Sequence, residues 1–336
     1  MKKTLLALAV MTAAGSANAA INVYDNNGVK VDLSGAAEVQ YFDGFEKSKD
    51  ATIRLDDGDF AINATYAINE NLNVISGMAF KYESRDVQND ELWVGFSSNQ
   101  MGALTFGRQL LVSDDSGIGK DYELGLEQVD FAQTEGDRVI KYVYDNGSFY
   151  AAASHELNAD HSTTITDGRL GFRTNGLDVR VYGYDGERVG AKGLELGISP
   201  DQKPIVKDPK NGLDIRGYNL EAEYGFGAFN VAASFGQIEY KDAKTHVTDK
   251  DLDLYEINGS YTMDKTTFAL GYVYAEDKHN NANHDNVYAN VTQQLHSNVK
   301  VYLEVGYADN DKVVSEKNNA KKFDDFGYVA GMEVKF

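Results

Sequence analysis

The sequence predicts an all-β protein, namely a transmembrane antiparallel β-barrel of 16 strands. Three observations support this prediction. The chain ends on a strictly alternating strand, it begins with an export signal, and short alternating segments recur between turn sequences. Tilted strands of about 9–11 residues are what a closed barrel needs to cross a bilayer.

The closing strand shows the alternation most clearly. Tyr328, Ala330, Met332, Val334 and Phe336 fall on one face, and Val329, Gly331, Glu333 and Lys335 fall on the other. A period of two places the two faces of a strand in different surroundings. We expect this strand to pair with the first one, because a closed barrel leaves no open edge.

The first 19 residues read as a cleavable signal peptide. Met1-Lys2-Lys3 is basic, residues 4–14 are mostly apolar, and Ala17-Asn18-Ala19 is a small-x-small cleavage site. The apolar stretch is shorter than the ~20 residues of a membrane helix. We therefore expect residues 1–19 to be removed, and residues 20–336 to form one barrel exported through the periplasm to the outer membrane.

Composition excludes several classes of function. Removal of Lys2 and Lys3 takes the net charge from −20 to −22, which argues against a nucleic-acid partner. The chain has no Cys, so it has no disulfide and no thiolate chemistry. Its 21 Tyr and 16 Phe suit the aromatic girdles of a membrane barrel.

The strands follow in order along the chain. In the first half they cover 29–41, 60–68 and 74–82, then the segment with Trp93, then 104–108. Strands six and seven are joined by Asp145-Asn146-Gly147, and strands eight and nine by Asn175-Gly176, both typical hairpin turns. In the second half we expect strands at 218–224, 229–235, two hairpins at 251–276 and 285–308, and a closing strand at 324–336. All three prolines lie between strands nine and ten, where no ladder donor is needed.

A long gap separates the fifth and sixth strands. Residues 109–136 contain seven acids and one base, for a net charge of −6. A connection of this length is either a functional loop or a solvated surface loop.

Four features stand out along the mature chain: the segment 23–35, Tyr41-Phe42, Phe106-Gly107-Arg108 and the terminal Phe336. In these residues the chain resembles the general diffusion porins of Gram-negative outer membranes. The resemblance implies a homotrimer of 16-stranded barrels that lets small hydrophilic solutes and ions pass, in contact with the bilayer and lipopolysaccharide. It also implies a third loop folded into the pore, and that Phe336, with Tyr328, is read by the barrel-assembly machinery. The vibrio type fits better than the enteric type, because basic residues expected on the wall are missing.

The resemblance assigns the candidate site. The third loop supplies the acidic side of the constriction, with Asp121, Glu123 and Glu127 at the matching positions and Asp114 and Asp115 nearer its start. Asp59 and Asp90 stand where the family has wall arginines. Basic wall residues are Lys81, Arg173, Arg180 and either Arg138 or Lys141, which lie on opposite faces of one strand; Arg138 matches the family better.

Confined carboxylates raise the local concentration of cations, so we expect weak cation selectivity that falls with salt. Two other classes stay open: an adhesin or receptor barrel, and a barrel hydrolase. No cofactor or metal site is predicted, since the six His residues lack a metal-ligand spacing and His279 and His284 read as solvated loop residues.

Overall fold

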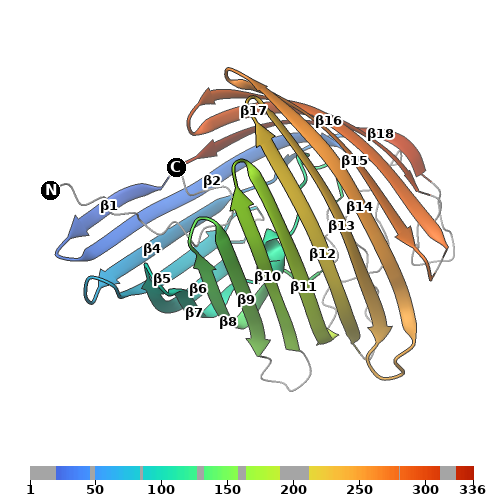
Figure 1. Cartoon of the computed structure of the whole chain (residues 1–336). Coiled ribbons are helices and arrows are strands. Elements are labelled where there is room, and N and C mark those ends of the chain that lie inside the picture. The colour runs from blue at the N-terminus through green and yellow to red at the C-terminus, as the bar shows by residue number, and fades with distance from the viewer. Residues whose placement is uncertain are drawn as a thin grey trace.

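The computed structural model describes residues 20–45, 50–83, 86–126, 132–157, 164–189, 212–279, 281–310 and 323–336. The predicted signal peptide, the three prolines and Glu127 lie outside these ranges. No helix in the described ranges has the length and apolarity needed to cross a membrane. The structure there consists of strands and one short 3₁₀ helix (Figure 1).

The strands have the following bounds: β1 Ile21–Asn26, β2 Val29–Asp43, β3 Thr52–Leu55, β4 Asp59–Ala67, β5 Asn73–Lys81, β6 Gln88–Ser98, β7 Gly102–Leu110, β8 Glu135–Asp145, β9 Phe149–Leu157, β10 Thr164–Thr174, β11 Leu177–Val189, β12 Leu213–Phe226, β13 Phe229–Asp242, β14 Thr248–Met263, β15 Thr266–Asp277, β16 Ala282–His296, β17 Val299–Asn310 and β18 Phe323–Lys335. The 3₁₀ helix η1, Val112–Asp115, follows β7.

Sixteen of these strands form a closed ring. Each strand from β4 to β18 pairs antiparallel with the next, and β2 closes the ring by pairing with β4 on one edge and β18 on the other. The predicted all-β fold and the 16-stranded barrel are therefore confirmed. Two short strands were not predicted: β1 pairs with the first part of β2, and β3 pairs with its second part.

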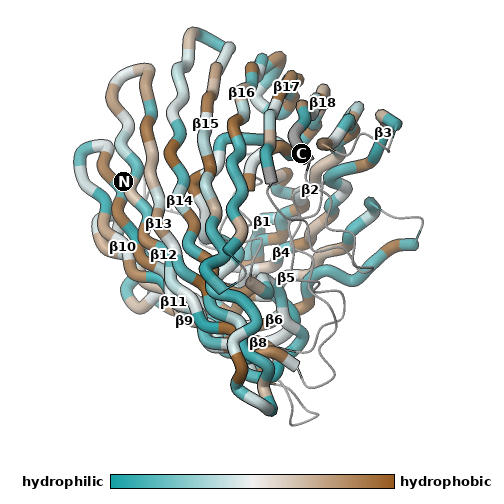
Figure 2. The backbone as a smooth tube through the Cα atoms, turned by 90° about the vertical axis from the view of Figure 1, so that its right-hand side faces the viewer, coloured by the Kyte–Doolittle hydropathy of each residue, from teal (hydrophilic) through white to brown (hydrophobic). Residues whose placement is uncertain are grey.

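Alternation along the strands separates the outer surface from the lumen. On β6, Leu92, Val94 and Phe96 are 62%, 58% and 50% exposed, whereas Trp93 between them is 6% exposed. Exposed large apolar side chains occur on most strands of the ring, and hydropathy alternates along the ribbons (Figure 2). The outer face is thus apolar, and the polar alternates face inward, as a membrane barrel requires.

Tight turns join the strands at one end of the barrel. Asn175 and Gly176 have φ values of 45° and 85°, and this pair of positive angles is what a two-residue hairpin turn needs. In the turn after β8, the Asn146 side-chain oxygen accepts hydrogen bonds from the backbone N–H groups of Ser148 and Phe149. These turns lie at the upper ends of their strands in Figure 1, so we equate that end of the barrel with the periplasmic side.

The two ends of the chain meet on one edge of β2. Phe336 exchanges backbone hydrogen bonds with Gly35 at 2.7 and 3.0 Å, and Ile21 pairs with Leu33 two residues away. β1 therefore continues the line of β18 along β2, and the start of β1 lies close to the C-terminal end of β18 (Figure 1). Tyr328 is 50% exposed on the outer face.

Four aromatic rings inside the barrel lie against glycines of neighbouring strands. Trp93 covers Gly77, and a Cβ at that glycine would come within 2.3 Å of the ring. Tyr150, Tyr288 and Tyr302 cover glycines of adjacent strands in the same way. The glycines are required because the rings occupy the space that a side chain would take.

Candidate functional site: the lumen and its internal loop

The loop between β7 and β8 enters the barrel directly after Leu110. The backbone N–H of Val112 donates to Ser154 Oγ at 2.9 Å, and the N–H of Ser113 donates to Asp167 Oδ2 at 2.6 Å. Both acceptors lie on the inner faces of β9 and β10. These bonds satisfy the first buried amides of the loop and fix its entry into the lumen (Figure 1).

The middle of the loop is fastened further along the wall by Glu221 of β12. This fully buried carboxylate accepts from Ser116 Oγ at 3.1 Å and from the Gly117 N–H at 2.8 Å. One strand pair further on, Asn258 Nδ2 donates to the Ile118 carbonyl at 2.7 Å. The loop therefore runs along the inner wall rather than across open solvent.

The far end of the loop is held by Glu304 of β17. Its two carboxylate oxygens accept from the consecutive N–H groups of Tyr122, Glu123 and Leu124 at 2.7, 2.9 and 2.8 Å. Asn290 Nδ2 donates to the same carboxylate at 3.1 Å. Consecutive amides that converge on one anion form a strong anchor, because each bond is charge-assisted.

Packing reinforces this anchor. Leu124 lies over Gly306 and Gly327, where a Cβ would come within 2.7 and 2.8 Å of the leucine side chain. The Tyr122 ring stacks on Tyr302 with centroids 3.4 Å apart and planes 5° apart. The tip of the loop is therefore fitted to the wall by shape as well as by hydrogen bonds.

The first two predicted acids of the loop belong to η1. Asp115 forms an ion pair with Arg169 of β10 at 2.8 Å. Burial raises the pKa of the Asp114 carboxyl to about 6, and the adjacent carboxylate of Asp115 adds to the shift. Both side chains thus lie at the root of the loop, inside the barrel.

Asp121 folds back on its own loop. Its Oδ2 accepts from the Gly125 N–H at 2.7 Å, and burial raises its pKa to about 6. The side chain therefore shapes a turn in addition to carrying charge. Glu127, the third residue of the predicted acidic group, lies outside the described residues.

Glu123 is tied to the wall at the tip of the loop. It forms a close ion pair with Arg54 of β3, and it accepts a hydrogen bond from Gln40 Nε2 at 3.0 Å. The Arg54 guanidinium also lies 3.7 Å from the centre of the Phe42 ring. Part of the negative charge at the tip is therefore neutralised by Arg54.

The wall from β4 to β6 places two acids, Asp59 and Asp90, around one base, Lys81. Lys81 Nζ lies 2.8 Å from Asp90 Oδ1, and Lys81 is the cross-strand partner of Asp59. An extra residue in β6 opposite Ala79–Phe80 makes a bulge at this point, and Asp90 occupies it. Asp59 and Asp90 therefore both lie beside Lys81, an arrangement that was not predicted from the sequence.

The choice between Arg138 and Lys141 falls on Lys141. Lys141 shares the inner face of β8 with Val139 and Val143, which are 1% and 7% exposed, and its Nζ donates to the Leu110 carbonyl at 3.0 Å. Arg138 lies on the opposite, exposed face. The expectation that Arg138 lines the wall is wrong, because the strand register follows the buried valines.

Arg173 and Arg180, which were expected to add positive charge to the wall, lie on the inner faces of β10 and β11. Arg173 pairs with Asp145 at 2.7 Å, and Arg180 forms a close ion pair with Glu221. Arg169, a third arginine of this wall, was not predicted. Each of the three guanidiniums is matched with a carboxylate, so this side of the wall carries opposite charges side by side.

Sequence reasoning missed several residues that build the site: Arg54, Arg169, Lys300, Asp167, Glu221 and Glu304. Alternation alone places the last five on inner faces, so it could have found them as lumen residues. It gives no sign that the carboxylates hold the loop, because that depends on the loop's path. Arg54 lies in a segment that was not predicted to be a strand.

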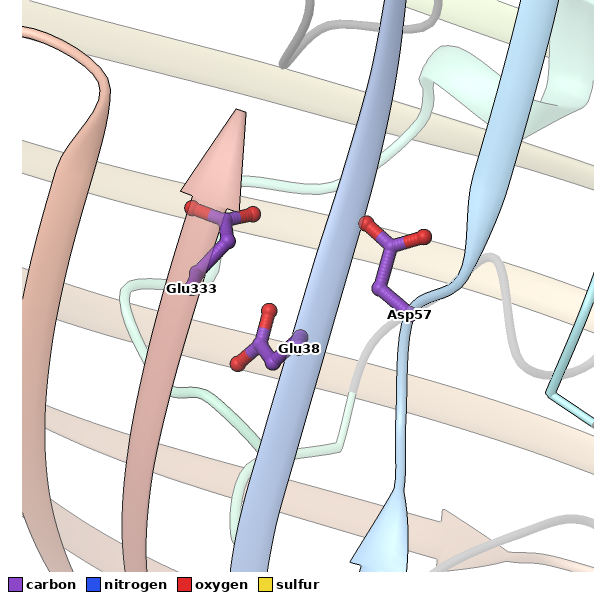
Figure 3. Close-up of side chains that lie close together, drawn as sticks. All are labelled: Glu38, Asp57 and Glu333. Atoms are coloured by element: carbon purple, nitrogen blue, oxygen red, sulfur yellow. The ribbon is translucent and has the colours of Figure 1, made fainter. Parts of the chain in front are cut away.

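Three carboxylates meet near the closing seam of the barrel, one each from β2, from β18 and from the connection between β3 and β4. Glu38, Asp57 and Glu333 lie with one oxygen of each within 4.8 Å of the others (Figure 3). Glu333 is paired with Lys300 and Lys335, both at 2.9 Å. Ammonium groups therefore already offset part of this negative charge.

The structure places His284 differently from the sequence prediction. It lies in β16 and is 1% exposed, so the prediction of a solvated loop residue is wrong for this histidine. The carboxylate groupings within metal-binding distance of one another in the described ranges contain Asp and Glu alone.

A family model described as Gram-negative porin matches residues 4–313 of the chain. "Porin-like protein H" of Photobacterium profundum is 50% identical over the full length of both chains. "Major outer membrane protein" of Pasteurella multocida is 24% identical and covers 91% of this chain and 93% of its own.

Solved structures share the fold. OmpT of Vibrio cholerae superposes with a TM-score of 0.75 at 20% identity, over 93% of this chain and 99% of its own. OmpF of Salmonella typhi gives a TM-score of 0.65 at 13% identity, over 94% and 100%. Together with the closed barrel and its apolar outer face, the family match and the 50% identical relative show that the chain belongs to the Gram-negative porin family, the diffusion channels of the outer membrane.

Proposed function

We propose that this channel passes small hydrophilic solutes and ions with a weak preference for cations. The observation that most strongly supports this proposal is the charge of the wall from β4 to β6, where Lys81 lies between Asp59 and Asp90. A wall of this kind presents more negative than positive charge to the passage.

The internal loop supports the proposal from the other side. Its root brings Asp114 and Asp115 into the lumen, and Arg169 balances one of the two. In a confined passage, such fixed charges raise the local concentration of cations. Salt screens charges over about 8 Å at physiological ionic strength, so the preference should be moderate and fall as salt rises.

The same loop is proposed to form the constriction. Asp167, Glu221 and Glu304 hold it against the wall at three places, so it narrows the lumen without hanging free. The loop acids Asp121 and Glu123 would then influence passing ions partly because the tip holds them in a fixed position.

Further proposals concern assembly. A homotrimer, contact with lipopolysaccharide, and recognition of Phe336 and Tyr328 by the barrel-assembly machinery follow from the family resemblance. Cleavage after residue 19 follows from the small-x-small site Ala17-Asn18-Ala19. A solved Vibrio cholerae OmpT described as a trimer form, with a TM-score of 0.72 at 21% identity, has this barrel fold.

The test is the reversal potential of the purified protein in a planar bilayer under a salt gradient. We expect stepwise conductance with a cation-signed potential, which moves toward zero when Asp59→Asn and Asp90→Asn are combined. A matched control removes two exposed carboxylates elsewhere, Glu70→Gln with Asp137→Asn, and should leave the potential unchanged. An anion-signed or zero potential in the wild type would refute the preference, and absence of conductance would refute the channel.

A further inference from the structure

A row of arginines and acids runs down the lumen wall from the internal loop to the periplasmic rim. Arg169 and Arg173 lie on the inner face of β10, and Arg180 of β11 pairs across to Gly171, midway between them. The row begins at the loop, where Arg169 meets Asp115 at 2.8 Å. Strands β8 to β12, which carry the row, lie side by side at the front of Figure 1.

The acids of the row alternate with the bases. Asp178 lies between Arg173 and Arg180, with oxygen-to-nitrogen distances of 3.4 and 3.8 Å. Arg180 also reaches Glu223 at 3.7 Å, and Lys120 of the loop pairs with Glu223 at 3.1 Å. A solute that leaves the constriction on this side therefore meets positive and negative groups in turn.

The row ends in an open hollow between two periplasmic turns. This hollow has a volume of ≈ 480 Å³ and is lined by Arg173 and Asp178, together with Leu177 and residues of both turns, among them Ser148 and Asn175. Its size falls within the about 300–1,000 Å³ typical of small-ligand sites. The Arg173 side chain is 39% exposed and Asp178 is 25% exposed, so both can be reached by a solute.

The chemistry of this pair discriminates among solutes. A simple cation that binds Asp178 displaces Arg173 and leaves the guanidinium without that partner, and a simple anion on Arg173 does the reverse to Asp178. A zwitterion replaces both partners at once, since its carboxylate meets the guanidinium fork and its ammonium meets the carboxylate. The Arg173 guanidinium is also held in place, 4.1 Å from the centre of the Tyr150 ring.

We propose that the hollow and the row above it form a binding track for small zwitterions, above all α-amino acids, with Arg173 and Asp178 as the residues that determine specificity. The proposal rests on the channel function above and deepens it by naming a class of solute. Binding at each step is weak, because the track's own ion pairs compete, and weak successive sites are what passage through a channel requires.

The test uses ligand-observed NMR titration of the full-length, detergent-solubilised protein with L-alanine. Propionate, ethylammonium and lactamide serve as the anionic, cationic and neutral analogues. We expect the wild type to bind L-alanine at least about tenfold more tightly than any analogue, a difference typical of losing one charge-assisted contact. The double variant Arg173→Gln with Asp178→Asn should weaken L-alanine binding by about the same factor.

The chain offers a matched control. Arg216 and Asp185 are also cross-strand partners, with a 3.2 Å contact, but they lie on the exposed outer face. Arg216→Gln with Asp185→Asn should leave both L-alanine binding and the wild-type conductance steps in bilayers unchanged.

The outcomes separate this proposal from the channel function. Equal binding of propionate and L-alanine, or full binding by the Arg173/Asp178 variant, would overturn the zwitterion track even though conductance is normal. Absence of conductance in the wild type would instead overturn the channel function itself.

Discussion

Replacement of Glu304 by alanine should release the tip of the internal loop. The carboxylate accepts three consecutive backbone N–H groups, from Tyr122, Glu123 and Leu124, at 2.7–2.9 Å. Hydrogen bonds to a charged group contribute about 1.5–3 kcal/mol each, so three of them have a gross value of about 4–9 kcal/mol. Solvent can replace part of this in an aqueous lumen, and we expect a net loss of about 2–4 kcal/mol.

This loss of binding free energy is comparable to what the remaining contacts of the loop tip contribute. The stacked Tyr122–Tyr302 pair contributes about 0.5–1.5 kcal/mol beyond its buried area. We therefore expect the tip to leave the wall for a substantial fraction of the time. Single-channel recording should show added current fluctuation between sub-levels that the wild type lacks.

Two further variants sharpen this experiment. Glu304→Gln keeps the shape and one acceptor oxygen, so it should lie between the wild type and Glu304→Ala. Glu333→Gln neutralises a lumen carboxylate of the neighbouring strand whose ion pairs are with lysines, and it should leave the current steady. Quiet, wild-type currents from Glu304→Ala would refute the view that this carboxylate holds the loop.

The remaining predictions concern charge, pH and packing. Arg54→Gln removes the counter-ion of Glu123, so the reversal potential should move further toward the cation limit, and a shift toward anions would contradict the assignment. Asp114 has a pKa raised by burial from 3.8 to about 6, so it is ionised at neutral pH and protonated below about pH 6. Cation preference should therefore fall on acidification through pH 6, and it should fall less in Asp114→Asn. The same raised pKa means that the contribution of Asp114 to stability falls as pH rises from about 4 to 6. Denaturant titrations of the wild type and of Asp114→Asn would detect this change. Gly77→Ala places a Cβ within 2.3 Å of the Trp93 ring and should destabilise the barrel by about 1–3 kcal/mol. The fluorescence of this single tryptophan measures the unfolding. Gly183→Ala is the control, because its Cβ would meet nothing within 4 Å, and it should leave the stability unchanged.

The ring of strands could be predicted from the sequence because the barrel has two solvents. Lipid outside and water inside impose a period of two on every strand, and turns such as Asn175-Gly176 mark where it reverses. β1 and β3 were not predicted from the sequence because they are short, and β3 pairs with β2 beside a loop. Short strands carry too few residues for a period to be recognised.

The site was predictable in its location and less so in its contacts. Parity predicted that Lys81 points inward, and it set Arg180 opposite the apolar face of its strand; both side chains lie in the lumen. The choice of Arg138 over Lys141 failed because it followed the family resemblance, whereas the buried valines of β8 set the register.

The loop shows a second limit of such reasoning. A run of acids predicts negative charge, but the fate of each side chain depends on a three-dimensional path. Asp121 ends against its own backbone and Glu123 against Arg54, from a separate segment. Contacts between distant, irregular segments leave no periodic signal in the sequence.

The seam between β18 and β2 has a consequence for the order of folding. Phe336 and Gly35 exchange hydrogen bonds although about 300 residues separate them, and such distant contacts form slowly. All other neighbours in the ring are joined through a single connection, so hairpins can form early while the seam waits for both ends of the barrel. Until it closes, β2 and β18 each present an unpaired edge that invites pairing with another chain. Export and insertion must therefore protect two open edges for as long as the seam is open, and any change that delays its closure should appear first as aggregation and only later as a defective channel.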